Sequence, residues 1–416
     1  MTLDCAVIGA GHVGLATSWH LGRLGVEHVV LEAGRVGETW RTQRWDSFAL
    51  NTPSWANVLP GQTEPAEPRD GFQTRDAWVH RLEDYATTQR LPVREATQIT
   101  ALEHAPGGGG FRLTTGGGDE IEARSVVVAA GFQRIPKLPT LATALPPSVK
   151  SLHTAHYRSP DQLPPGAVLV VGSAQSGGQI AEDLLDAGRR VFLAASNVGR
   201  IPRRYRGRDI LEWLFPLGYF DQPVELADAH TRLAPPPMIS GVGRYGHTLS
   251  LQFLAARGAV LLGRLHGVED NRLSFENDLA GSIAHADRVS AQARQLIDRA
   301  IEEQDMTAAR AEADPADDPF PDPEALASPV ELDLDAEGIA SVIWATGFTF
   351  DVSWIGIPVV DGTGALSHQG GRASIPGLWF LGMPWLISRK SAIIYGSVGD
   401  SAAIAEQVTG FLAERI

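Results

Sequence analysis

The chain has 416 residues, of which 44% are hydrophobic, and a formal net charge of −14. This length favours two or three domains, and so acidic a protein is not expected to hold nucleic acid by charge. The single cysteine, Cys5, excludes an intrachain disulfide framework and a paired-cysteine redox centre. There is no apolar run of membrane-spanning length and no signal-like segment before the first strand pattern, so we expect a cytoplasmic enzyme.

The chain opens with a βαβ pattern. Residues 3–8 read as a buried strand, residues 14–24 as a helix and residues 27–32 as a second strand. A unit of this size and order is typical of a dinucleotide-binding fold. The N-terminus of its helix would face the phosphates of such a ligand with a partial positive charge.

The turn inside this unit carries the residues that a dinucleotide requires. Gly9 permits a tight turn, Gly11 lets the backbone approach a pyrophosphate, and Gly14 lets the helix pack closely on the strand. Glu32 ends the second strand, where a carboxylate accepts hydrogen bonds from the hydroxyls of an adenosine ribose. The sequence therefore predicts a dinucleotide site, and these residues alone do not separate NAD from FAD.

Less regular patterns follow. Residues 35–68 have no clear period and read as a long functional loop. Helical spacing over residues 74–89 places three large side chains on one face: Trp78, Leu82 and Tyr85. Residues 99–121 read as a meander of strands with glycine-rich turns, and residues 125–130 as another buried strand.

A second βαβ unit follows a proline-rich crossing over residues 136–165. Its predicted strand, helix and strand cover residues 168–171, 177–187 and 191–195. Its turn contains Gly172 and Gly177. The repetition predicts two dinucleotides held close together, as in electron transfer between a nicotinamide and a flavin.

The second turn departs from the pattern at two points. Ala174 replaces the middle glycine, and the spacing that leads to Glu32 in the first unit leads here to Ala195 and Ser196 rather than to an acid. A carboxylate at that position would repel a 2′-phosphate, whereas a serine followed by arginines would welcome one. The pattern therefore favours NADPH over NADH, with these arginines as the expected ligands: Arg200, Arg203 and Arg204.

The last third of the chain predicts a helix over residues 282–307 and an acidic, proline-rich loop over residues 313–329. Two apolar runs, residues 339–344 and 378–381, are expected to return to the first domain. A helix over residues 400–413 closes the chain.

Together these elements predict an α/β fold with two Rossmann-like dinucleotide-binding domains of the three-layer ββα type, the second inserted in the first. The predicted division is 1–150, 151–330 and 331–416. The first and last of these segments would form the FAD-binding domain and the middle one the NADPH-binding domain.

With its two glycine turns in this order, the chain resembles the flavin-containing monooxygenases, which belong to the class B flavoprotein monooxygenases. That family carries a fingerprint F-x-G-x-x-x-H-x-x-x-[YF] between its two turns. His153 and Tyr157 match it, whereas Leu145 and Pro147 stand where Phe and Gly are expected. The resemblance runs from residue 3 to about residue 405.

The resemblance implies FAD at the first turn, NADPH at the second, and Asn51 beside the reactive edge of the flavin. An asparagine that only starts a turn before Pro53 is the alternative for Asn51, and an N-cap is a compatible interpretation of Asp400. Further cofactor contacts are implied for these residues: His12, Thr39, Trp40, Trp45, Ile99, Gly131, Gln175, Ser176, Thr346, Gly347, Gly382 and Asp400.

The implied activity is insertion of one atom of O2 into a small organic substrate, at a nitrogen or sulfur atom, through a C4a-hydroperoxyflavin. This chemistry belongs mainly to the cofactor and requires no metal. A Baeyer–Villiger or amine N-hydroxylating enzyme would use the same cofactors, although Tyr157 argues against the former. A non-catalytic FAD-binding redox module is the alternative from another class, and Ala174 is its main support. The substrate and a homodimeric state stay open.

Overall fold

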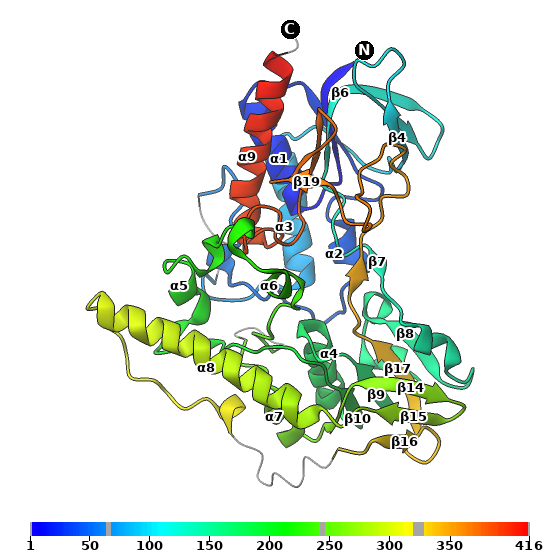
Figure 1. Ribbon diagram of the computed structural model, residues 1–416, viewed down its shortest axis with the longest axis vertical. Helices are drawn as coiled ribbons and strands as arrows, with labels where there is room; N and C mark the ends of the chain where they lie inside the picture. Colours follow the sequence, from blue (N-terminus) through cyan, green and yellow to red (C-terminus); the bar gives the residue numbers. More distant parts are fainter. Residues whose placement is uncertain (1, 64–67, 242–245, 319–327, 415–416) are drawn as a thin grey trace.

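The protein is described here by a computed structural model that covers residues 2–63, 68–241, 246–318 and 328–414. Residues 64–67 and 319–327, which are parts of the predicted loops 35–68 and 313–329, lie outside the described residues, as do residues 242–245. Two sheets with parallel strands dominate the molecule, one near the two chain ends and one at the opposite end (Figure 1). The predicted α/β class is confirmed.

The first sheet combines strands from the two ends of the chain. Its strands are β1 Leu3–Ile8, β2 His28–Leu31, β3 Val93–Arg94, β4 Ile99–His104, β5 Phe111–Thr115, β6 Glu120–Val128, β19 His368–Gln369, β20 Arg372–Ala373 and β21 Leu378–Phe380. The main order is β19-β20-β21-β6-β1-β2-β3, with parallel pairing from β21 to β3. The hairpin β4–β5 continues antiparallel onto β6.

The parallel strands of this sheet have helices on one face and the hairpin β4–β5 on the other, as the alternating side chains of β1 demonstrate. Cys5 and Val7 share a buried cluster with residues of α1 His12–Arg23, α3 Arg75–Thr88 and α9 Ile394–Ala413. Ala6 and Ile8 point to the other face, where they join residues of the hairpin. The arrangement is the predicted three-layer ββα type, and α1 and α9 pack together on the helical face.

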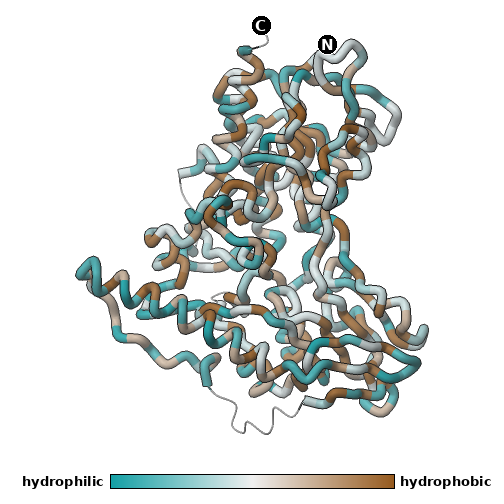
Figure 2. The backbone as a smooth tube through the Cα atoms, in the orientation of Figure 1, coloured by the Kyte–Doolittle hydropathy of each residue, from teal (hydrophilic) through white to brown (hydrophobic). Residues whose placement is uncertain are grey.

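The second sheet is entirely parallel, with the order β13-β10-β9-β17-β8. Its strands are β8 Lys150–His153, β9 Ala167–Val171, β10 Val191–Ala194, β13 Val260–Leu262 and β17 Ile339–Trp344. Helices α4 Gln175–Asp186 and α7 Leu251–Ala256 cover one face, and the small sheet β14 Leu265–Glu269, β15 Arg272–Phe275 and β16 Glu331–Asp333 covers the other. In Figure 2, apolar residues gather along the strands of both sheets.

The prediction that residues 339–344 return to the first domain is wrong, because β17 is a central strand of the second sheet. Only residues 334–338 separate β17 from β16, which lies in the small sheet that covers the second sheet, so the chain has no room to reach the first sheet between them. The other apolar run, β21, does pair with β6 of the first sheet as predicted. An apolar run predicts a buried strand but does not identify its neighbours.

The two passages between the sheets lie side by side. β7 Ile135–Pro136, on the way out, pairs antiparallel with β18 Phe348–Thr349, on the way back. The chain therefore returns toward the first sheet after Trp344. The three-part division into domains at residues 150 and 330 stays a prediction.

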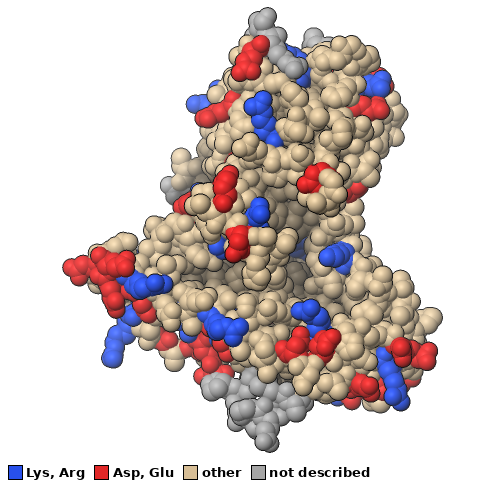
Figure 3. All heavy atoms as spheres, viewed as in Figure 1, with Lys and Arg blue, Asp and Glu red and all other residues tan. Residues whose placement is uncertain are grey.

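The remaining helices are α2 Glu38–Thr42, α5 Ile210–Leu214, α6 Ala229–Leu233 and α8 Leu279–Glu303, and the strands β11 Arg204–Tyr205 and β12 Arg208–Asp209 form a small hairpin. The long helix α8 extends from the second sheet, and acidic side chains gather at its far end (Figure 3). Within the described ranges, no helix is long and apolar enough to cross a membrane.

Candidate functional site

The first glycine turn has the close packing that its glycines predict. Gly9 has a φ of +108°, and a Cβ placed on Gly14 would lie 1.9 Å from the carbonyl oxygen of Gly9. A Cβ on Gly11 would instead meet nothing within 4 Å. Gly9 and Gly14 therefore serve the packing of α1 on β1, whereas Gly11 borders open space in front of the helix.

Glu32 holds the end of β2 to this turn. One carboxylate oxygen, Oε2, accepts a hydrogen bond from the backbone N–H of Ala10 at 2.7 Å, and Oε1 accepts from that of Gly34 at 2.9 Å. A carboxylate has about four acceptor positions, so two remain for hydroxyl groups of a ligand. The carboxylate is thus fixed in orientation before any ligand binds.

Buried polar atoms without a partner gather around the first turn. His12 begins α1, and its ring lies 6.1 Å from that of Trp40 and 6.4 Å from that of Trp78. Across the described residues, no protein partner meets His12 Nε2, Trp45 Nε1 or Trp78 Nε1. Burial lowers the pKa of His12 to about 4, so its ring is neutral at neutral pH.

The second turn has the same backbone geometry as the first. Gly172 has a φ of +104°, and a Cβ on Gly177 would lie 1.8 Å from the carbonyl oxygen of Gly172. Ala174, in the position of Gly11, has φ −71° and ψ −178°, against −78° and 179° for Gly11. The alanine is therefore free of backbone strain, and its methyl group affects only how closely a ligand approaches.

Ser173 replaces the acid as the connection between the second turn and its strand end. Its hydroxyl accepts a hydrogen bond from the backbone N–H of Ser196 at 3.0 Å. The side chain of Gln175 is also engaged, because Oε1 accepts from the N–H of Ile239 at 2.9 Å and Nε2 donates to the carbonyl of Ser240. Ser176 beside it is half-buried, and within the described residues no hydrogen bond of its hydroxyl is seen.

Arg200 does not lie free to meet a phosphate. It is 3% exposed and forms ion pairs with Asp287 of α8 and with Asp317, both at 2.7 Å. Its guanidinium therefore holds α8 and the segment after it against the second sheet. The prediction that it binds a 2′-phosphate does not fit this arrangement.

Arg203 is likewise committed within the protein. It is 1% exposed, pairs with Asp209 at 2.5 Å, and lies 4.9 Å above the ring of Phe72. Burial lowers the pKa of Arg203, and the neighbouring carboxylate opposes this shift. Of the three predicted arginines, only Arg204 is exposed, and it lies in the hairpin strand β11.

Asn51 lies where the first half of the chain meets the second. Its side-chain oxygen accepts a hydrogen bond from Gln179 Nε2 of α4 at 3.2 Å, and its main-chain oxygen accepts one from Arg203 at 2.8 Å. Its side chain thus reaches another unit rather than only starting a local turn before Pro53. Sequence reasoning missed Gln179, although its place one turn into the helix after the second glycine turn was visible.

The matching half of the fingerprint is structural. Ala155 N–H donates to Nδ1 of His153, so Nε2 carries the proton and donates to the carbonyl of Gly347 at 2.8 Å. The hydroxyl of the buried Tyr157 donates to Asp183 of α4 at 2.6 Å. These two residues fix the passage between the sheets.

The C-terminal helix begins earlier than predicted. It starts at Ile394, so Asp400 lies inside α9 and is not its N-cap. Gly396 allows this early start, because a Cβ there would lie 2.0 Å from the carbonyl oxygen of Lys390. Asp400 is 4% exposed, and burial raises its pKa.

The other predicted contacts are spread over both sheets. Thr39 and Trp40 lie in α2, and Trp45 is buried after it. Ile99 begins β4 two residues after Thr97, whose N–H donates to the carbonyl of Glu32. Gly382 follows β21 and faces Val13 of α1. Gly131 follows β6, while Thr346 and Gly347 follow β17, at the ends of the two passages. The cofactor contacts of these residues stay predictions.

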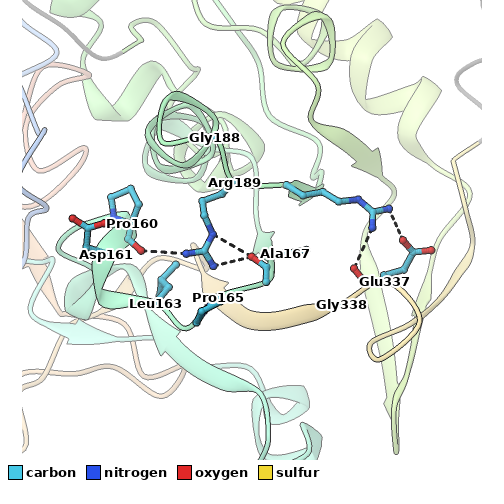
Figure 4. Close-up of a pocket in the computed structure, with 11 residues that line it drawn as sticks. Pro160, Asp161, Leu163, Pro165, Ala167, Gly188, Arg189, Glu337 and Gly338 are labelled. Atoms are coloured by element: carbon cyan, nitrogen blue, oxygen red, sulfur yellow. Dashed lines mark hydrogen bonds and ion pairs between the residues drawn. The ribbon is translucent and has the colours of Figure 1, made fainter.

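One open depression of about 690 Å³ lies away from all these residues (Figure 4). Ala167, at the start of β9, borders it, whereas the glycine turn follows the other end of that strand. Arg189 extends into it and donates to the main-chain oxygen of Gly166 at 2.8 Å, and Arg190 pairs with Glu337. These arginines hold loops together at the edge opposite the turns.

Fold and site together define an oxidoreductase with two dinucleotide-binding units. The sequence profile of the family described as pyridine nucleotide-disulphide oxidoreductase matches residues 6–214. An uncharacterised oxidoreductase, CzcO-like, of Geobacillus kaustophilus is 31% identical, and the match covers 96% of each chain. The chain belongs to the pyridine nucleotide-disulphide oxidoreductase family.

Two other relatives bear on the predicted resemblance. Indole-3-pyruvate monooxygenase YUCCA1 of Oryza sativa subsp. japonica is 28% identical over 64% of this chain and 68% of its own. The structure of a flavin-containing monooxygenase from Stenotrophomonas maltophilia superposes with a TM-score of 0.66, covers 99% of each chain and shares 19% identity. The resemblance to flavin-containing monooxygenases is confirmed.

The family also includes disulfide reductases by name, but this chain has no thiol pair. Cys5 is the single cysteine in the sequence and lies fully buried in β1. Burial raises the pKa of its thiol to about 12, so the thiol is unreactive at neutral pH. Dithiol exchange is therefore excluded for this member.

Proposed function

We propose that this protein is a FAD- and NADPH-dependent monooxygenase that transfers one atom of O2 to a nitrogen or sulfur atom of a small organic substrate. The observation that carries the proposal is the hydrogen bond between Asn51 and Gln179. It connects the predicted active-site amide to a residue one turn into the helix that follows the second glycine turn. Such a junction is where a nicotinamide and a flavin would have to meet.

The residues of the first unit fit FAD. Open space lies in front of Gly11, and Glu32 is held in place with acceptor positions to spare. The unpartnered His12 Nε2 and Trp45 Nε1 mark a polar lining that a bound ligand would cover. The adenosine end would then lie at Glu32 and the pyrophosphate at the start of α1.

The second unit fits NADPH with fewer contacts than predicted. Ala174 adopts the backbone conformation of Gly11, and the strand end carries Ser196 instead of an acid. Arg200 and Arg203 are occupied by carboxylates, so the preference over NADH rests on the missing acid. We infer a weaker discrimination between the two coenzymes than three free arginines would give.

The chain's own part in the reaction is to position groups and exclude water. Bound FAD and NADPH would supply hydride transfer and oxygen activation. Asn51 would offer a neutral N–H donor beside the flavin, and an amide cannot release a proton that discharges activated oxygen as peroxide. The sequence fingerprint ending in Tyr157 favours heteroatom oxygenation over Baeyer–Villiger chemistry.

The test is oxygen uptake with product analysis across amines, sulfides, indoles and ketones, using the FAD-loaded protein and NADPH. We expect consumption of O2 with one oxygen atom appearing in an amine, sulfide or related product. Esters formed from ketones would favour the Baeyer–Villiger alternative. Release of hydrogen peroxide alone from every member of the panel would contradict the proposal.

A further inference from the structure

Gln179 is a buried amide with only half of its hydrogen-bonding capacity used. It lies in α4 and is 2% exposed. Its Nε2 donates to Asn51 Oδ1, while Oε1 is buried and finds no donor anywhere in the described chain. A buried acceptor without a partner lowers stability, so packing alone would favour an apolar side chain here.

The contact decides which half of the Asn51 amide faces away from α4. Because Oδ1 is held by Gln179, the amide NH2 of Asn51 points elsewhere, and within the described residues no hydrogen bond engages it. The two ends of an amide are similar in shape and differ in hydrogen bonding, so the partner fixes the orientation. Because Gln179 donates to the Asn51 oxygen, Asn51 presents its NH2 donor on the side away from Gln179.

The main chain of Asn51 is held separately. Arg203 donates to its carbonyl oxygen at 2.8 Å, and Leu50 N–H donates to the carbonyl of Gln73 at 2.9 Å. Asn57 stabilises the same loop, because its Nδ2 donates to the carbonyl of Thr52 at 3.0 Å. Loss of the Gln179 contact would therefore free the side-chain amide and leave the loop in place.

We propose that Gln179 is a positioning residue that fixes the Asn51 amide with its NH2 toward the flavin. The proposal rests on the proposed function, and it adds a residue of the nicotinamide unit to the control of the flavin environment. The direction of the Asn51–Gln179 hydrogen bond then determines whether the flavin meets a donor or an acceptor.

The experiment uses the FAD-loaded full chain and two substitutions at Gln179. One removes its hydrogen-bonding groups, and the other replaces its donor by an acceptor. Gln179→Leu keeps the volume and removes the donor, so the Asn51 amide becomes free to rotate. Gln179→Glu, when ionised, only accepts, so Asn51 would turn its NH2 to it and present oxygen to the flavin. Gln252→Leu is the matched control, because Gln252 is another buried glutamine with an unpartnered Oε1, but it contacts Asp287.

We expect both Gln179 variants to shift the visible absorption bands of the bound oxidised flavin in the same direction, and Gln179→Glu to shift them further than Gln179→Leu. We also expect the share of NADPH electrons lost as hydrogen peroxide to rise by about 3- to 10-fold, the range for loss of one hydrogen bond. In an Asn51→Ala background, Gln179→Leu should add nothing further. Gln252→Leu should change stability alone.

A flavin spectrum identical to that of the unmodified protein in both Gln179 variants would overturn the inference. So would an equal effect of Gln179→Leu with and without Asn51→Ala. If one Gln179 variant fails to fold, the other and Asn51→Ala still decide the question. Failure of the proposed function is separate, because it would appear as a lack of flavin reduction by NADPH in the unmodified protein.

Discussion

The two glycine turns have nearly the same backbone conformation, but the hydrogen bond that ties each turn to the end of its second strand runs in opposite directions. In the first, a strand-end carboxylate, Glu32, accepts from the N–H of Ala10 in the turn. In the second, Ser173 occupies the position of Ala10, and its hydroxyl accepts from the N–H of Ser196 at the strand end. In the first unit the strand end supplies the side-chain acceptor, whereas in the second unit the turn supplies it. The second strand end therefore needs no charged side chain.

Because of this difference, the first turn is suited to a ligand that stays bound, and the second to a ligand that binds and leaves. The first turn carries an acid held by two backbone amides and suits a ribose that stays in place. The second has a neutral strand end, which leaves room for a 2′-phosphate, and Ala174 limits close approach without straining the backbone. The pair is therefore expected to hold FAD tightly and the pyridine nucleotide more loosely.

The largest expected effect tests the shared geometry. Gly14→Ala and Gly177→Ala each place a Cβ within 2 Å of a backbone oxygen. Each should lower the free energy of unfolding by about 3 kcal/mol, the upper range for overpacking, or prevent folding. Urea denaturation measures this loss.

Gly410→Ala is the control for the glycine substitutions. It lies in the exposed face of α9 with nothing within 4 Å of a Cβ, so the change should be neutral or stabilising by up to about 1 kcal/mol. If Gly177→Ala proved as mild as Gly410→Ala, the two turns would not share their packing.

The next effect concerns His12 and its counterpart Gln175. The pKa of His12 is lowered to about 4 in the folded protein, against 6.5 when exposed. Between these values the unfolded chain binds a proton that the folded chain does not, so stability falls as pH decreases from about 6.5 to about 4. The loss amounts to as much as about 3 kcal/mol.

His12→Gln copies the second turn and should remove this contribution. Unfolding of both proteins at pH 7 and pH 4 checks it, because other acid-sensitive groups cancel in the difference. Equal pH profiles for the two proteins would mean that His12 does not stay neutral in the folded state.

The smallest effect exchanges the middle residues. Gly11→Ala should leave the stability of the unloaded protein within about 0.5 kcal/mol, because its Cβ meets no neighbour, but weaken FAD binding. Ala174→Gly should tighten NADP+ binding by a few-fold. Ligand titrations measure both changes. Tighter FAD binding by Gly11→Ala, or weaker NADP+ binding by Ala174→Gly, would contradict the comparison of the two turns.

Most elements could be predicted from the sequence because they are locally determined. The strands β1, β9 and β10 and helices α3 and α8 follow from buried runs and helical spacing. The partners of β17 could not be predicted, because an apolar run carries no information about neighbouring strands. The start of α9 was missed because Gly396, needed for close approach to Lys390, reads as a helix breaker.

The site divides in the same way. The glycines and Glu32 follow from spacing, since one βαβ unit contains them all. The roles of Arg200 and Arg203 depend on aspartates that are distant in sequence, such as Asp287, and composition does not reveal such pairs. Gln179 was missed because its partner, Asn51, lies 128 residues away.

The central claim is that the first unit holds FAD and the second brings NADPH to reduce it. Anaerobic mixing of the FAD-loaded protein with NADPH, followed by visible absorbance, tests this most directly. The account predicts full loss of the oxidised-flavin bands with one NADPH per flavin. A flavin that stays oxidised with excess NADPH would contradict it.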